Sequence, residues 1–162
     1  MKKALLISAI ALAASTWVPA QPFTEAEARK IIAPLYANFT MPVKGDTQSL
    51  LEQGTTQDWQ SCTGEDAKNC RSREVSAQVF AGFGQSIPNM KHEIKEMIVA
   101  DEKTVVRGEL TGTPFGEFYG VPHSGKSFRI MTVDIQTIKG GKVAKTNHLE
   151  DWASALNQLR AK

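Results

Sequence analysis

Apolar residues recur at helical spacing through the first half of the chain. Residues 24–36 begin with a capping box, formed by Thr24 and Glu27, and continue with apolar residues every three or four positions. A shorter apolar segment at 46–54 and a longer one at 72–87 follow, each beginning with Asp or Ser, residues that cap helices well. The pattern therefore predicts three helices in this half.

From residue 91 onward, apolar and polar residues alternate, which predicts strands. The predicted strands are residues 92–99, 105–113, 115–119, 127–138 and 143–149. Lys139-Gly140-Gly141-Lys142 predicts a hairpin turn, and an apolar stripe at 152–159 predicts a short C-terminal helix. Helices followed by consecutive strands predict an α+β fold, with the helices packed on one face of a curved antiparallel sheet.

Residues 1–20 have the three parts of a secretory signal peptide. A positive start precedes an uncharged apolar run at 4–14, and Val18-Pro19-Ala20 places small residues before a cleavage point. The alternative is a transmembrane anchor, but this run is too short to cross about 30 Å of hydrocarbon. We therefore expect a single domain at residues 21–162 that is periplasmic or secreted, with no membrane contact after cleavage.

The predicted leader also changes the charge balance. The 162 residues include 19 Lys and Arg against 17 Asp and Glu. Removing Lys2 and Lys3 with the leader leaves 17 basic and 17 acidic residues. A neutral domain with mixed charges lacks the basic surface of a nucleic-acid-binding protein, so we expect no nucleic acid partner.

Export bears on the two cysteines, Cys62 and Cys70. In an oxidising compartment, two cysteines this close in sequence most simply form a disulfide. A metal or redox pair is the alternative, but no partner histidines lie nearby. The polar residues 55–71 that hold both cysteines predict a long loop closed by this bond.

One phosphate-binding motif matches by spacing alone. Gly120, Gly125, Lys126 and Ser127 fit the pattern G-x-x-x-x-G-K-[ST], whose chemistry requires a helix directly after it. Here a predicted strand follows, so we interpret the segment as a turn between strands. The three histidines show no spacing typical of metal ligands, so we expect no metal site.

Polar residues inside the predicted sheet are the remaining candidates for chemistry. Asp134 and Gln136 share a strand face with apolar residues, and burial there commonly shifts the pKa of a carboxyl group. His148, Glu150 and Asp151 cluster where the last strand meets the last helix, and they could supply general acid–base catalysis. A structural interpretation is also open, in which Asp151 caps the helix, Glu150 lies in solvent and His148 is an ordinary strand residue.

Two segments resemble the SnoaL-like polyketide (ester) cyclases. Residues 112–122, Gly-Thr-Pro-Phe-Gly-Glu-Phe-Tyr-Gly-Val-Pro, are similar to the family's G-T-x-x-G-x-F-x-G-x-P segment, and Ser124-Gly125-Lys126 follows as in the family. Residues 148–159 resemble its closing segment, an aspartate followed seven residues later by Gln-Leu. The resemblance runs from about residue 87 to residue 159.

This resemblance implies the nuclear transport factor 2-like fold, an α+β cone around an apolar pocket. It also implies cyclisation by an aspartate acting as general acid and base without metal or cofactor, and motif position makes that aspartate Asp151. We expect His148 and Gln136 to orient or polarise the substrate. Gln136 stands where close relatives often carry histidine. The expected ligand contacts are Asp134, Trp59 and Phe118.

Three hypotheses of function follow. The first is an exported, cofactor-independent enzyme acting on a small apolar carbonyl or ester compound. The second is an exported protein of the same fold that binds such a compound without converting it. The third is a structural module that forms a homodimer through its open sheet face.

Overall fold

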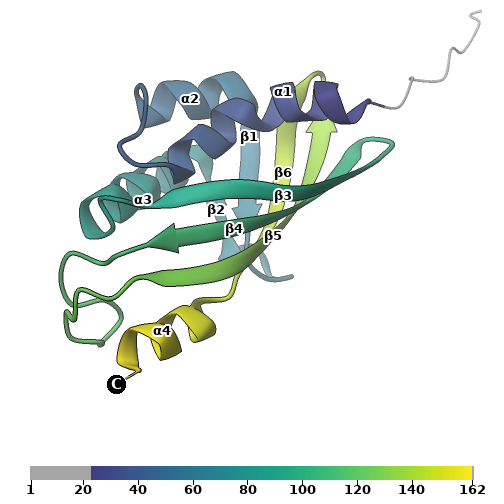
Figure 1. Ribbon diagram of the computed structural model, residues 1–162. Helices are drawn as coiled ribbons and strands as arrows, with labels where there is room; N and C mark the ends of the chain where they lie inside the picture. Colours follow the sequence, from purple (N-terminus) through teal and green to yellow (C-terminus); the bar gives the residue numbers. More distant parts are fainter. Residues whose placement is uncertain (1–22, 162) are drawn as a thin grey trace, which may run out of the picture.

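Helices cover one side of a strongly twisted sheet in the computed structural model, which describes residues 23–161 (Figure 1). The helices are α1 (Glu25–Tyr36), α2 (Thr47–Gly54), α3 (Arg73–Ser86) and α4 (Trp152–Arg160). The strands are β1 (Thr55–Cys62), β2 (Cys70–Ser72), β3 (Lys91–Ala100), β4 (Lys103–Gly112), β5 (Phe128–Lys139) and β6 (Lys142–Glu150). Two short 3₁₀ helices, η1 (Ala37–Phe39) and η2 (Ala67–Asn69), complete the elements. The predicted signal peptide, residues 1–20, lies outside the described residues.

The strands form one sheet in the order β2-β1-β6-β5-β4-β3. Helices α1 and α2 lie near one end of this sheet, and α4 lies at the other (Figure 1). The α+β cone predicted from the sequence is therefore confirmed. The prediction of a wholly antiparallel sheet was wrong in one place, because β1 pairs with β6 in parallel.

The helices begin where the sequence predicts. Thr24 Oγ1 accepts a hydrogen bond from the Glu27 amide at 3.2 Å, and Glu27 accepts one from the Thr24 amide at 2.8 Å, which completes the capping box. Asp46 and Ser72 cap α2 and α3 through their side chains. These caps satisfy amide groups that a helix start leaves without partners.

The segment predicted as a long loop, residues 55–71, contains β1, η2 and most of β2 instead. Its polar composition hid the strands, because only part of β1 faces the protein interior. Trp59 is the main buried side chain of β1, with 1% of its surface exposed. Besides the nearby β2, β1 pairs with β6, which lies more than 80 residues further along the chain and beyond the reach of local patterns.

A second correction concerns residues 115–119, which were predicted to form a strand. They form a tight turn held by one isolated bridge, in which the amides of Phe118 and Val121 each donate to the other's carbonyl at 3.0 Å. Tyr119 and Gly120 turn the chain with φ of 46° and 74°. β5 begins at Phe128, directly after the phosphate-motif residues, so the predicted strand there is confirmed.

The turn between β5 and β6 matches its prediction. Gly140 and Gly141 have φ of 56° and 74°, which suits a two-residue hairpin of type I′. This turn fixes the register of the two strands that carry most of the polar residues described below.

No helix in residues 23–161 is long and apolar enough to cross a membrane.

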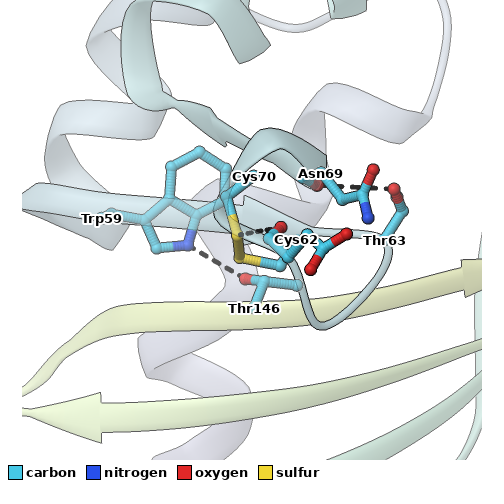
Figure 2. The surroundings of a disulfide bond; sticks show 7 residues. Trp59, Cys62, Thr63, Asn69, Cys70 and Thr146 are labelled. Carbon is cyan, nitrogen blue, oxygen red and sulfur yellow. Dashed lines mark hydrogen bonds between the residues drawn. A yellow bond between two sulfur atoms is a disulfide. The ribbon is translucent and has the colours of Figure 1, made fainter.

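The predicted disulfide is present and joins the ends of β1 and β2 (Figure 2). Cys62 and Cys70 are direct cross-strand partners, and the Thr63 amide donates to the Asn69 carbonyl at 3.0 Å beside them. The bond thus closes the hairpin at the point where its two strands separate. Closing so short a loop stabilises the fold by limiting the freedom of the unfolded chain.

We expect the double variant Cys62→Ser, Cys70→Ser to lose about 2.6 kcal/mol of unfolding free energy, the chain-entropy value for a loop of this length. Urea unfolding of both proteins measures the difference. Thiol titration of the unfolded, unreduced wild type is the control and should find no free thiol. Two free thiols would contradict the pairing.

Candidate active site in the cone

A cavity of about 440 Å³ opens between α3 and the polar face of the sheet. Its helix-side wall is aromatic, and the aromatic residues that line it from the helical segments are Tyr36, Phe39, Phe80, Phe83 and Trp152. The opposite wall comes from β1, β5 and β6 and carries polar side chains. An apolar cavity with a few converging polar groups is the usual form of a small-molecule site.

Polar side chains on the sheet side form a continuous hydrogen-bonded chain. Trp59 Nε1 donates to Thr146 Oγ1 at 3.0 Å (Figure 2), and Thr146 donates to Gln136 Oε1 at 2.6 Å. Gln136 Nε2 in turn donates to Tyr36 Oη at 3.3 Å. Tyr36 Oη then donates to Asp134 Oδ2 at 2.5 Å, which links α1 to β5. Every member therefore has a fixed orientation at the cavity wall.

The chain ends in a histidine held between two carboxylates. His148 Nδ1 lies 2.5 Å from Asp134 Oδ1, and His148 Nε2 lies 3.3 Å from Glu150 Oε2. Trp152 Nε1 also donates to Glu150 Oε2, at 2.7 Å. The side chains of His148, Asp134 and Glu150 are 15%, 5% and 8% exposed, so water screens their charges weakly.

This arrangement fixes the protonation of His148. Burial alone lowers the pKa of the imidazole, but the hydrogen bonds and charges of Asp134 and Glu150 outweigh burial and raise the pKa to about 10. At neutral pH His148 is therefore an imidazolium that donates through both ring nitrogens. Burial and the neighbouring Asp134 charge raise the pKa of Tyr36 well above its usual range, so the phenol stays a donor.

Strand alternation explains why these groups meet. Asp134 and His148 are direct cross-strand partners in β5 and β6. Gln136 and Thr146 form the neighbouring pair on the same face, two residues along each strand. Glu150 follows His148 by two residues and so returns to that face.

Asp151 lies elsewhere. Its side chain is exposed and caps α4, accepting from the Ser154 amide at 3.0 Å and from Ser154 Oγ at 2.6 Å. These hydrogen bonds lower the pKa of Asp151, which favours the ionised cap. The residue does not line the cavity. The structure thus gives Asp151 the capping role that the sequence left open.

The cavity brings together four of the predicted site residues: His148, Gln136, Asp134 and Trp59. Phe118 does not line this cavity but an adjoining groove of about 320 Å³, which shares Val79, Phe83 and Tyr119 with it. Glu150, expected in solvent by the structural interpretation, lies in the cavity wall.

Tyr36, Thr146 and Arg71 line the cavity but were missed by sequence reasoning. A tyrosine at the end of the apolar stripe of α1 was the one local signal among them.

Within residues 23–161, no group of three or more His, Cys, Asp or Glu side chains could hold a metal ion.

The fold and cavity define an α+β cone of the nuclear transport factor 2-like superfamily. The chain belongs to the SnoaL-like polyketide cyclase family, which its residues 35–159 match. This confirms the resemblance and supports a cofactor-free cyclase- or isomerase-type function. No curated protein matches the sequence.

Solved structures agree on the fold. TsrD from Streptomyces laurentii is similar with a TM-score of 0.71 at 19% identity, covering 86% of this chain and 99% of its own. A SnoaL-like protein from Jannaschia sp. CCS1 gives 0.71 at 18%, covering 88% and 99%. IdmH from Streptomyces antibioticus gives 0.69 at 24%, covering 82% and 97%.

The raised pKa of His148 predicts how stability depends on pH. The folded state holds the proton more tightly than the unfolded state, whose pKa is about 6.5. The stabilisation is therefore complete below about pH 6.5 and is lost as pH rises through about 10. Urea unfolding from pH 6 to 10 should show this decline in wild type and a smaller one in His148→Gln. If NMR shows that the imidazole of His148 titrates near pH 6.5, the assignment is contradicted.

Proposed function

We propose that this protein is exported and catalyses cofactor-independent proton transfer on a small apolar carbonyl or ester compound bound in the cone. One observation carries the proposal: the imidazole of His148 lies between two carboxyl groups in the wall of an aromatic cavity. Paired acid and base groups in a water-poor pocket are what removal of a proton next to a carbonyl requires.

The charge and hydrogen bonds of each side chain determine which group acts as the acid and which as the base. His148 already carries both of its protons at neutral pH, so it acts as an acid and a carboxylate must be the base. Both oxygens of Asp134 accept hydrogen bonds, from Tyr36 and from His148. Glu150 uses Oε2 for its contacts, and Oε1 makes no hydrogen bond with any residue in 23–161. Glu150 Oε1 is therefore the base that we propose.

In the reaction, Glu150 takes a proton from a carbon acidified by adjacent carbonyl groups. The electron pair left by the C–H bond moves into the carbonyl, and the positive charge of the nearby His148 stabilises the resulting enolate oxygen. The enolate carbon then attacks a second carbonyl of the same molecule to form a carbon–carbon bond. Glu150 returns the proton to the new alkoxide, so no proton is gained or lost. An isomerase-type reaction differs only in returning the proton to another carbon.

This proposal changes the role expected for Asp151. The family motif placed the acid and base at Asp151, whose side chain caps α4 and does not line the cavity. Glu150 is the preceding residue and lies in the cavity wall. Gln136 keeps its orienting role, because it holds Tyr36 at the cavity wall.

Proton exchange tests the proposal without knowledge of the natural substrate. Ethyl 2-methyl-3-oxo-3-phenylpropanoate has one acidic carbon-bound proton, and its exchange in D₂O is followed by NMR. We expect wild type to accelerate exchange and Glu150→Gln to lose about 10²-fold of that rate, the usual contribution of general base catalysis.

Asp151→Asn is the matched control, because asparagine caps a helix as well as aspartate does. It should keep the wild-type exchange rate within about twofold, whereas loss of exchange would return the role to Asp151. If wild type binds the probe but accelerates no exchange, the second hypothesis holds, and the cone is a binding protein without turnover.

Export has one structural support. The Cys62–Cys70 disulfide is compatible with a periplasmic or secreted protein. The signal peptide at residues 1–20 remains a prediction from sequence.

We also propose a homodimer formed through the open sheet face. Ile98 on β3 and Ile135 on β5 are 56% and 37% exposed, and both pair with Val105 of the strand between them. Met131 adds a further exposed apolar side chain on β5, 54% exposed. Adjacent exposed apolar side chains on a sheet commonly mark a contact with another chain.

The dimer proposal predicts that Ile135→Glu shifts the protein from dimer to monomer, because it buries a charge in the contact. Val75→Glu is the control, since Val75 is also exposed, at 45%, but lies on α3. Sedimentation velocity at micromolar concentration measures both. A monomeric wild type, or equal effects of the two changes, would contradict the proposal.

A further inference from the structure

We propose that the ligand of the cavity carries a carboxylate, held at the β1–β2 end by Arg71. This inference rests on the proposed function for the cavity as the ligand site, but it does not depend on turnover. It adds an anionic group to the apolar carbonyl or ester compound proposed above.

Arg71 is a cation placed in an aromatic cavity without a protein partner. It lies on β2, is partly buried and is the one Lys or Arg that lines the cavity among the described residues. The ion pairs found in residues 23–161 do not include it, although neighbouring Arg73 and Lys68 contact Glu74 and Asp66. An unpaired guanidinium in such a place is available to a ligand, and its planar fork matches a carboxylate.

The hydroxyl group of Ser76 is a second, independent indication of a ligand in this cavity. Ser76 lines the cavity from the first turns of α3, its side chain is 3% exposed, and its Oγ has no hydrogen-bond partner among residues 23–161. Buried hydroxyl groups are nearly always hydrogen-bonded, so an unpartnered one at a cavity suggests a missing ligand atom. Ser61 and Thr63 on the adjoining hairpin add two more hydroxyl groups to this lining.

The sheet sets the distance between this end and Gln136, which belongs to the hydrogen-bonded chain that ends at the proposed acid–base groups. Arg71 pairs with Ser61, Ser61 with Thr146, and Thr146 with Gln136, so these residues form one row across β2, β1, β6 and β5. Three strand spacings separate the backbones of Arg71 and Gln136 by about 14 Å. A ligand with an apolar body between a carboxylate and a reacting carbonyl fits this separation.

The disulfide holds Arg71 in place. Cys70 precedes Arg71 directly, and its bond to Cys62 ties the three-residue edge strand β2 to β1 (Figure 2). A cation fixed before binding loses less freedom when the ligand arrives, which favours affinity. The bond that stabilises the hairpin thus also positions the proposed anion site.

Charge balance favours a carboxylate over a dianion such as phosphate. Among the residues that line the cavity, Arg71 and His148 offset Asp134 and Glu150. A ligand carboxylate adds one negative charge next to Arg71. Asp134 and Glu150 repel this single charge less than they would repel the two charges of a dianion.

Calorimetric titration with 1-naphthylacetate and its uncharged analogue 1-naphthylacetamide tests the inference. We expect wild type to bind the carboxylate at least about tenfold more tightly than the amide. Arg71→Gln should remove this preference and leave the affinity for the amide unchanged. Arg71→Lys should keep part of the preference, because it retains the charge without the planar fork.

Arg107→Gln is the matched control, because Arg107 is exposed on β4 and pairs with Glu96 outside the cavity. It should bind both probes as wild type does. Ser76→Ala provides a second variant with the guanidinium intact, and we expect a weaker preference for the carboxylate. Circular dichroism confirms that each variant is folded.

Three results would overturn the inference: no binding of the carboxylate at millimolar concentration, equal binding of the two probes by wild type, or a preference that survives Arg71→Gln. Glu150→Gln separates this test from that of the proposed function. It should abolish proton exchange and keep the carboxylate preference. Either result can therefore fail while the other stands.

Discussion

A buried imidazolium between two carboxylates, His148 between Asp134 and Glu150, is the interaction on which the site depends. Taking three charges out of water is costly, and only close opposite charges and hydrogen bonds offset that cost. The register of β5 and β6 supplies them by placing Asp134 opposite His148. The same cluster binds the sheet to the helices, since Tyr36 of α1 contacts Asp134 and Trp152 of α4 contacts Glu150. Removing one member leaves a buried charge without its partner, so the cluster is kept or lost as a unit.

The cluster also determines what the cavity can do. Because the carboxylates hold the proton on His148, the histidine is an acid at neutral pH, and basic chemistry falls to a carboxylate. A lone histidine in this cavity would be a base, with its pKa lowered by burial from the usual value near 6.5. His92 shows the contrast: it lies in the same region, makes a hydrogen bond to Thr132 and has its pKa lowered, with burial as the main cause. The two histidines differ because only one of them touches two carboxylates.

Local sequence signals predicted those parts of the fold that local physics decides. The caps at Thr24 and Ser72, the Gly140–Gly141 turn and the alternation in β5 each depend on neighbouring residues, and each was found. The strand β1 was missed, because its partner β6 is distant and its exposed residues are polar. Tyr36 was missed for the same reason, since its contact with Asp134 spans 98 residues. Half of the candidate site, the β5–β6 half, could thus be predicted, because alternation alone puts Asp134 and Gln136 on one face.

The difference between Glu150 and Asp151 shows where motif reasoning needs geometry. A motif specifies a position along the chain, but in a strand consecutive side chains point to opposite faces. A single step along the chain therefore separates a carboxylate in the cavity wall from one that caps a helix in solvent. Glu150 is the last residue of β6, so the strand sets the direction of its side chain. Asp151 is the N-cap of α4, so helix capping sets the direction of its side chain. The last strand residue is the one that lines the cavity, because helix capping needs the Asp151 side chain turned toward the amides that follow it.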